Sequence, residues 1–90
     1  MSIEINLPPS LQPLAGDAKQ VQVSGRTVGD CLKELVRRYP PLRKKLFSAR
    51  GKLLNSINIF INSGAAPSGV LSGPVKDGDI IHIFIPVLGG

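Results

Sequence analysis

The chain has 90 residues, enough for one domain with a modest core and too few for a second. It holds one cysteine and one histidine, which excludes an internal disulfide and a zinc or iron–sulphur site built from its own residues. No apolar run approaches the roughly 20 residues that span a bilayer, and residues 1–10 lack the pattern of a signal peptide, so we expect a soluble, cytoplasmic protein that binds neither metal nor membrane.

Two short strands are predicted near the N-terminus. Residues 3–7 alternate apolar and polar side chains until Pro8 and Pro9, which cannot continue a ladder. After a loop rich in turn residues, residues 20–24 alternate valines with polar side chains. We expect the two segments to pair as a hairpin.

A helix is expected to begin after Thr27, whose hydroxyl can cap the first turn, while Asp30 places a negative charge near the positive end of the helix dipole. The apolar residues that follow fall on one helical stripe. They are Val28, Cys31, Leu32, Leu35, Val36 and Tyr39. Pro40 and Pro41 end this helix, and residues 41–47 are predicted to form a further helical turn.

Two more strands are predicted in the C-terminal half. Residues 57–62 alternate isoleucines with other side chains, and residues 79–85 form a second apolar strand that ends at Pro86. Asn62 to Gly78 between them is rich in glycine and proline and is expected to be a loop. Its candidates for the core are Val70, Leu71 and Val75.

The order strand, strand, helix, strand, strand predicts an α+β fold of the β-grasp (ubiquitin-like) type. We expect a mixed sheet of four to five strands with one main helix packed on one face. The predicted core is Ile3, Ile5, Val21, Val23, Cys31, Leu32, Leu35, Ile57, Ile59, Ile81 and Ile83. The strand of residues 79–85 should be central or near-central, and Phe60, His82 and Phe84 should lie on the sheet face opposite the helix.

The most informative feature is the pair Gly89 and Gly90 after the apolar segment 80–88. Without a Cβ, two glycines can thread a narrow slot in a partner's active site and leave the terminal carboxylate unhindered. If the chain ends at Gly90 in the cell, that carboxylate is a candidate reactive group. The alternative is a frayed tail, for which glycine is common.

The ending Asp77-Gly78-Asp79, an apolar strand, Pro86 and Gly89-Gly90 resembles that of the MoaD and ThiS family of ubiquitin-like sulphur carriers. The resemblance extends over nearly the whole chain in length and element order, including the helix start at Thr27 and the strand of residues 57–62. The long connection between Tyr39 and Ile57 resembles MoaD-like and CysO-type members more than the shorter ThiS proteins.

The resemblance implies that residues 1–90 form one sulphur-carrier domain with 86–90 as an extended reactive tail. Gly90 is then adenylated by an E1-like enzyme of the MoeB or ThiF type, which uses ATP and magnesium, and converted to a thiocarboxylate. The tail that threads the partner's active site comprises Pro86, Val87, Leu88 and Gly89. A sulphur-accepting enzyme of molybdopterin, cysteine or thiamin biosynthesis is the second partner. The chain itself is expected to be a carrier and co-substrate, or the small subunit of a synthase, and not an enzyme with catalytic residues of its own.

Phe84 matches a position that contacts partner enzymes in MoaD-like proteins, and Phe60 and His82 share its predicted face, so all three are candidate interface residues. The alternative for the two phenylalanines is that a loop covers them. A catalytic role for His82 is disfavoured because no nucleophile or second ligand accompanies it. Cys31 is interpreted as an inert core residue and not as a reactive thiol.

The formal net charge of +5 is unusual beside the neutral or acidic charge expected of this family. The basic residues cluster between the helix and the third strand: Arg37, Arg38, Arg43, Lys44, Lys45, Arg50 and Lys52. Such a cluster can steer the protein toward an acidic partner, or it can mark a small nucleic-acid-binding domain. Nucleic-acid binding is disfavoured because aromatic residues are few. A ubiquitin-like modifier conjugated through Gly90 remains a further alternative, since it needs the same tail.

Overall fold

The computed structural model describes residues 2–62, 64–65 and 70–85. The strands are β1 (Ser2–Asn6), β2 (Gln20–Ser24), β3 (Asn58–Ile61), β4 (Gly64–Ala65) and β5 (Ile80–Phe84). The helices are α1 (Val28–Arg38) and the short α2 (Arg43–Leu46), with 3₁₀ turns at Gln12–Ala15, Pro40–Leu42 and Val70–Ser72.

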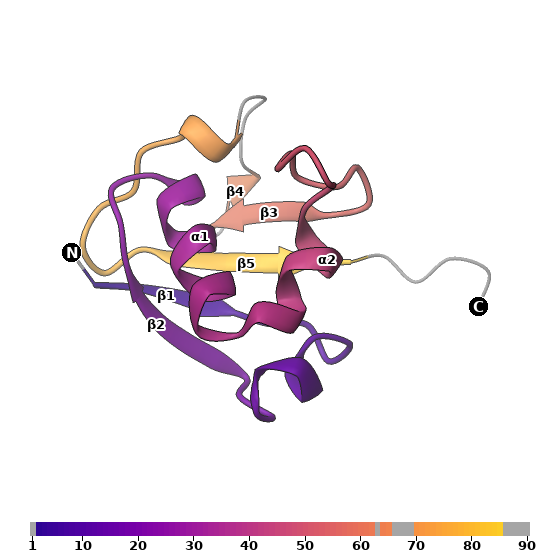
Figure 1. Ribbon diagram of the computed structural model, residues 1–90. Coiled ribbons are helices and arrows are strands. Elements are labelled where there is room, and N and C mark those ends of the chain that lie inside the picture. The colour runs from indigo at the N-terminus through magenta and orange to yellow at the C-terminus, as the bar shows by residue number, and fades with distance from the viewer. Residues whose placement is uncertain (1, 63, 66–69, 86–90) are drawn as a thin grey trace.

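The five strands form one mixed sheet in the order β2-β1-β5-β3-β4. β1 pairs antiparallel with β2 as a hairpin and parallel with β5, and β5 pairs antiparallel with β3. The helices α1 and α2 both lie on one side of this sheet (Figure 1). The β-grasp prediction is therefore confirmed, including the central place of β5.

Helix α1 begins where the sequence predicts. Thr27 is in an extended conformation, and its hydroxyl accepts a hydrogen bond from the Asp30 backbone N–H at 3.1 Å. The Asp30 carboxylate in turn accepts the backbone N–H of Arg26 at 3.3 Å, so that the two side chains fix the chain on both sides of the helix start. The helix ends at Arg38, because Pro40 and Pro41 follow its C-cap residue Tyr39.

The predicted core is confirmed, since each of its members is buried with at most 7% of its surface exposed. The structure adds five apolar residues to which the sequence analysis gave no core role, Leu7, Leu11, Ala15, Leu42 and Leu46, and it also buries Val28 of the predicted helical stripe and the core candidate Val75. Ala15, Leu42 and Leu46 lie in 3₁₀ or short helical turns, where no hydrophobic period can develop. The first loop and the segment after α1 lie against each other and together close one end of the core.

The prediction of an unbroken loop over residues 62–78 was incomplete. This segment contains strand β4 and the 3₁₀ turn Val70–Ser72, which lies against α1. Of the core candidates, Val75 is buried and Leu71 is partly buried, while the side chain of Val70 lies outside the described part of the structure. Two backbone hydrogen bonds anchor the segment to the start of the helix, from Val28 to the Gly73 carbonyl and from Val75 to the Arg26 carbonyl.

Gly29 makes this close approach possible. A Cβ on residue 29 would lie 2.8 Å from the carbonyl oxygen of Leu71, which is backbone and cannot rotate away. Glycine inside a helix ordinarily costs about 1 kcal/mol relative to alanine. Its presence here is explained by the contact between the helix and the 70–72 turn.

We expect Gly29→Ala to lower the free energy of unfolding by about 1–2 kcal/mol, because the steric cost of overpacking exceeds the gain in helix propensity. Urea denaturation followed by circular dichroism measures the change. Lys33→Ala is the matched control, since Lys33 is exposed on the same helix. A Gly29→Ala protein as stable as the parent would contradict the proposed contact.

Cys31 lies in the core with 0% of its surface exposed. Burial, and secondarily the charge of Asp30, raises the pKa of its thiol, so the reactive thiolate is disfavoured at neutral pH. Both effects agree with the prediction of an inert core residue.

The Cys31 thiol of the folded protein should react with iodoacetamide at pH 8 at least about tenfold more slowly than in urea. Because the raised pKa belongs to the folded state alone, unfolding at constant pH should restore ordinary reactivity. Intact mass spectrometry at timed intervals follows the alkylation. Equal rates in the folded and unfolded protein would show that the thiol is accessible.

Candidate functional site

The predicted reactive tail comprises Pro86, Val87, Leu88, Gly89 and Gly90, and all five lie outside the described residues. The structure describes the strand that leads into it. β5 is paired on both sides, with Ile81 opposite Ile5 of β1 and Ile83 opposite Ile59 of β3. The base of the tail is therefore held at the centre of the sheet.

The turn that precedes β5 is fixed by polar contacts to two other strands. Gly78 has a φ of +89°, a conformation that favours glycine, and Ser2 of β1 donates its backbone N–H to the Asp77 carboxylate at 2.6 Å. The Asp79 carboxylate accepts the backbone N–H of Lys76 at 2.8 Å and the side-chain amide of Asn62 at 3.2 Å. These hydrogen bonds, with the one from Lys76 first, lower the pKa of Asp79, so its carboxylate stays charged at neutral pH.

Asn62 joins this turn to the end of β3. It has a φ of +57°, and its side-chain oxygen accepts the backbone N–H of Ile80 at 3.0 Å. Its own backbone N–H donates to the Ile80 carbonyl at 2.7 Å. Sequence reasoning assigned no role to Asn62, although asparagine is one of the few residues that tolerate this backbone conformation.

The predicted interface residues are brought together on the sheet face opposite the helices. Phe60 of β3 stands opposite His82 of β5, and Phe84 lies two residues further along β5 on the same side. Phe60 is 41% exposed and Phe84 is 51% exposed, so the alternative that a loop covers the two rings is wrong. Exposed phenylalanines on adjacent strands make an apolar patch of the kind found at protein interfaces. We call Phe60, His82 and Phe84 the open-face patch.

His82 is partly buried and is held by a neighbouring strand. Its Nδ1 lies 3.0 Å from the side-chain nitrogen of Asn6, its partner in the parallel β1–β5 pairing. If the Asn6 amide donates this hydrogen bond, the imidazole carries its proton on Nε2. Among the described residues no group of three metal-binding side chains surrounds it. The pairing across the strands thus gives the imidazole a structural role beside the apolar patch.

A groove of about 740 Å³ runs beside the base of the tail. It lies between the segment after β1 and the end of β5 and is lined mainly by apolar surface. Its residues are Asn6, Leu7, Pro8, Pro9, Ser10, His82, Ile83, Phe84 and Ile85. The groove therefore extends the open-face patch to the last described residue before the tail. Sequence reasoning missed it, because the parallel pairing that places Pro8 beside β5 leaves no local signal.

Comparison with known proteins agrees with this geometry. The model of the ThiS family matches residues 5–90. Small archaeal modifier protein 1 of Haloferax volcanii is 39% identical over 72 residues, which is 79% of each chain. No helix in the described part of this chain is long and apolar enough to cross a membrane.

Solved structures share the whole architecture. The crystal structure of SAMP1 from Haloferax volcanii superposes with a TM-score of 0.88 at 35% identity over 100% of both chains. A chain in the crystal structure of the BexX/CysO complex of Amycolatopsis orientalis superposes with a TM-score of 0.88 at 30% identity, over 98% of this chain and 99% of that one. The resemblance drawn from the C-terminal motif is confirmed, and the chain belongs to the ThiS family of ubiquitin-like β-grasp proteins.

Proposed function

We propose that this protein is a sulphur carrier whose Gly90 carboxylate is adenylated by an E1-like enzyme and converted to a thiocarboxylate. The observation that carries the proposal is the Gly89-Gly90 ending, which residues 85–88 connect to the central strand of a ThiS-family fold. The thiocarboxylate donates its sulphur in a biosynthetic pathway of the molybdopterin, cysteine or thiamin type. Because the activation consumes ATP, we place the reaction in the cytoplasm.

The chemistry explains why an enzyme partner is needed. A carboxylate is a poor electrophile, and reaction with ATP, assisted by magnesium on the activating enzyme, gives an acyl-adenylate and releases pyrophosphate. A sulphide-level sulphur donor then attacks the Gly90 carbonyl, and AMP leaves. The carrier contributes the carboxylate and the tail, while the catalytic groups belong to the partner, so we assign the chain the role of co-substrate.

The shape of the body supports this division of roles. β5 is paired with β3 as far as Phe84, and the open-face patch with its adjoining groove offers apolar contact area beside this end of the strand. A partner that binds this face can receive the five residues 86–90 in its active site. Phe84 is the natural anchor of such a contact because it is the most exposed large apolar side chain described.

A ubiquitin-like modifier is the second candidate function. It is favoured by the 39% identity to a relative named as a modifier protein. Conjugation uses the same Gly90 adenylate but ends in an amide bond to a lysine of a target. The two functions therefore use the same tail and differ in the nucleophile that attacks the Gly90 adenylate, which is a sulphur donor in one and a lysine in the other.

Incubation with ATP, magnesium, an E1-like enzyme and sulphide should exchange one oxygen for sulphur on the C-terminal peptide, as measured by intact and peptide mass spectrometry. Deletion of Gly89 and Gly90, or extension past Gly90 by an uncleavable residue, should abolish the exchange, because either change removes the free glycine carboxylate. Isopeptide adducts on lysines without the exchange would favour the modifier. Absence of both products would overturn the proposed function.

Phe84→Ala should raise the apparent Kd for the E1-like enzyme at least about tenfold while leaving the free energy of unfolding within about 1 kcal/mol of the parent, because the ring is largely exposed. Isothermal titration calorimetry and urea denaturation give the two quantities. Arg26→Ala is the control, since Arg26 is exposed between β2 and α1, outside the open-face patch and its groove. Equal affinities of the parent and the Phe84→Ala protein for the E1-like enzyme would show that the open-face patch is not part of the interface.

A further inference from the structure

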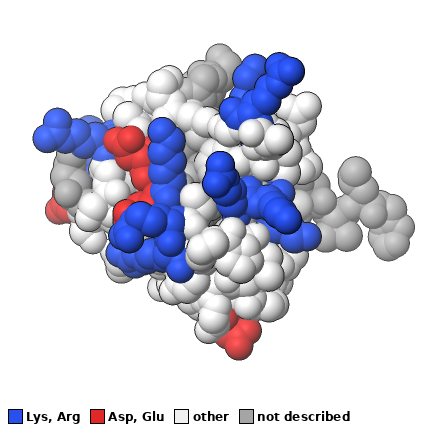
Figure 2. Space-filling view, viewed as in Figure 1, with Lys and Arg blue, Asp and Glu red and all other residues white. Residues whose placement is uncertain are grey.

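The helix side of the molecule carries most of its positive charge. Residues 31–57 hold eight of the 11 Lys and Arg residues of the chain and only one of its six Asp and Glu residues, Glu34. Figure 2 shows the basic side chains gathered over α1 and α2, on the side of the sheet opposite the open-face patch. The basic surface is therefore separate from the open-face patch, which we propose binds the activating enzyme.

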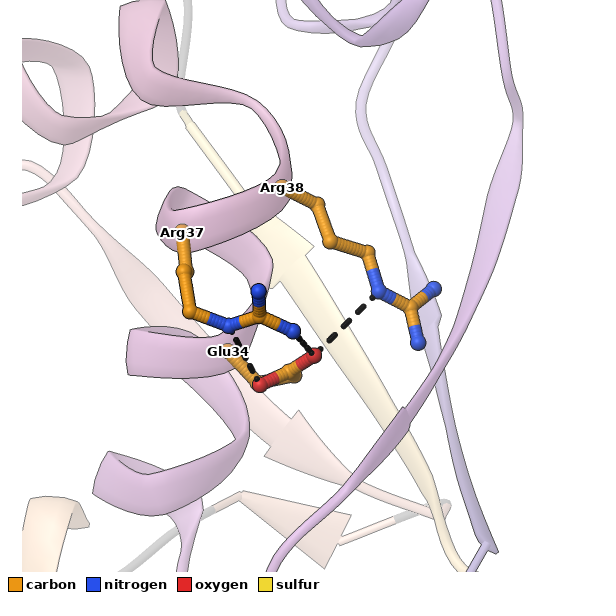
Figure 3. A network of polar contacts seen from close by, with 3 residues as sticks. All are labelled: Glu34, Arg37 and Arg38. Atoms are coloured by element: carbon orange, nitrogen blue, oxygen red, sulfur yellow. Dashed lines mark hydrogen bonds and ion pairs between the residues drawn. The ribbon is translucent and has the colours of Figure 1, made fainter.

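Glu34 neutralises little of this charge. It lies between Arg37 and Arg38 and forms an ion pair with both, as the close view shows (Figure 3). The hydrogen bond from Arg37 lowers the pKa of Glu34, which keeps the carboxylate charged, yet one carboxylate shared by two guanidinium groups leaves a net positive charge. In the described part of the chain these are the two ion pairs present, so Lys33, Arg43 and Lys44 have no carboxylate partner.

The basic surface also contains an apolar hollow. A groove of about 460 Å³ runs between α1, α2 and the segment that follows. Lys33, Arg37 and Arg43 stand along it, and Val36, Pro40 and Phe47 provide apolar lining. Val36 and Phe47 are only partly buried, so they present apolar surface between the cations. We call this the basic groove.

A second hollow continues the first. It is lined by Arg43, Lys44, Phe47, Ser48, Ala49 and Leu54. Arg43 and Phe47 line both, and they lie four residues apart on the same short helical segment, with the Phe47 backbone N–H bonded to the Arg43 carbonyl. A partner that occupies both hollows must therefore cross the Arg43 and Phe47 side chains.

We propose that the basic groove is a docking site for an acidic, amphipathic segment of a partner protein. Charge complementarity selects the sign of the ligand, since several cations without internal partners face solvent around the groove. The apolar lining selects the kind of ligand, because an apolar side chain of a partner peptide can bury itself against Val36 and Phe47 while its carboxylates reach Lys33 and Arg43. A polynucleotide matches the charge but not the lining, which offers one partly buried aromatic ring and no exposed stacking platform.

The site does not depend on the chemistry of Gly90. The groove lies on the helix side of the sheet, and the open-face patch lies on the other side, so both can be occupied at once. An acidic segment bound in the groove would hold a partner on the carrier while the tail engages an active site. Failure of the docking site and failure of the sulphur-carrier function are thus measured separately.

The test uses the full-length, isotope-labelled protein and three probes of equal length. They are a peptide with glutamate and leucine at helical spacing, an all-glutamate peptide and a single-stranded oligouridine RNA. The double variant Arg43→Glu, Lys44→Glu, called the groove variant, reverses one charge of the basic groove and one charge of the hollow that continues it. Lys19→Glu, Arg26→Glu is the matched control, because it changes the net charge equally at exposed positions outside the groove.

The amphipathic peptide should shift the amide signals of α1 and α2, and its Kd should rise at least about tenfold in the groove variant and less than about twofold in the control. The all-glutamate peptide should bind more weakly than the amphipathic one, since it cannot use the apolar lining. Equal losses in both variants would show that net charge alone acts, and tighter binding of the RNA would assign the surface to nucleic acid. Absence of peptide binding, or signals shifted only on the sheet, would also overturn the proposal.

Discussion

The rest of the structure depends on the pairing of β5 along both of its edges. Its hydrogen bonds to β1 and β3 place it in the middle of the sheet, and Ile81 and Ile83 bury their side chains under α1. Each buried isoleucine contributes about 1.5–3 kcal/mol of hydrophobic stabilisation relative to an exposed one. The strand that leads to the tail is therefore joined to β1 as far as His82 and to β3 as far as Phe84.

The side chains of β5 alternate between the buried core and the open face of the sheet. Ile81 and Ile83 point into the core, whereas His82 and Phe84 lie on the open face. A slip of one residue in the register would exchange the two sets and bury a histidine in place of an isoleucine. The contacts of Asn62 with the start of β5, together with the Asp77–Asp79 turn, oppose such a slip. Asn62 and the Asp77–Asp79 turn thus help to determine which side chains of β5 are exposed on the open face.

The spacing of apolar residues along the sequence was sufficient to predict the strands and the main helix, in which that spacing is regular. Ile59 of β3, Ile81 and Ile83 of β5 and the first part of the α1 stripe are buried as predicted, and Thr27 caps the helix. Val36 and Tyr39, at the end of that stripe, are only partly buried. The 3₁₀ turn Gln12–Ala15 and the buried Leu42 and Leu46 were missed, because segments of three or four residues owe their burial to what they pack against. The face shared by Phe60 and Phe84 was predicted from strand phase alone. The groove beside the tail was not, since it requires the parallel pairing of β1 with β5, which joins residues more than 70 positions apart.

The open face of the sheet and the helix side differ in their charge. The five described strands carry one Asp, Glu, Lys or Arg side chain, Glu4, whereas the helix side carries the excess that gives the whole chain its charge of +5. Contacts on the open face are therefore governed by apolar burial and depend little on salt, while attraction to the helix side weakens as the Debye length falls below about 10 Å near 0.1 M salt. An acidic partner approaching from solution is drawn first to the helix side, because steering acts over longer distances than apolar contact. If the basic groove docks such a partner, the opposite face, with the strand that leads to Gly90, stays open to a second protein.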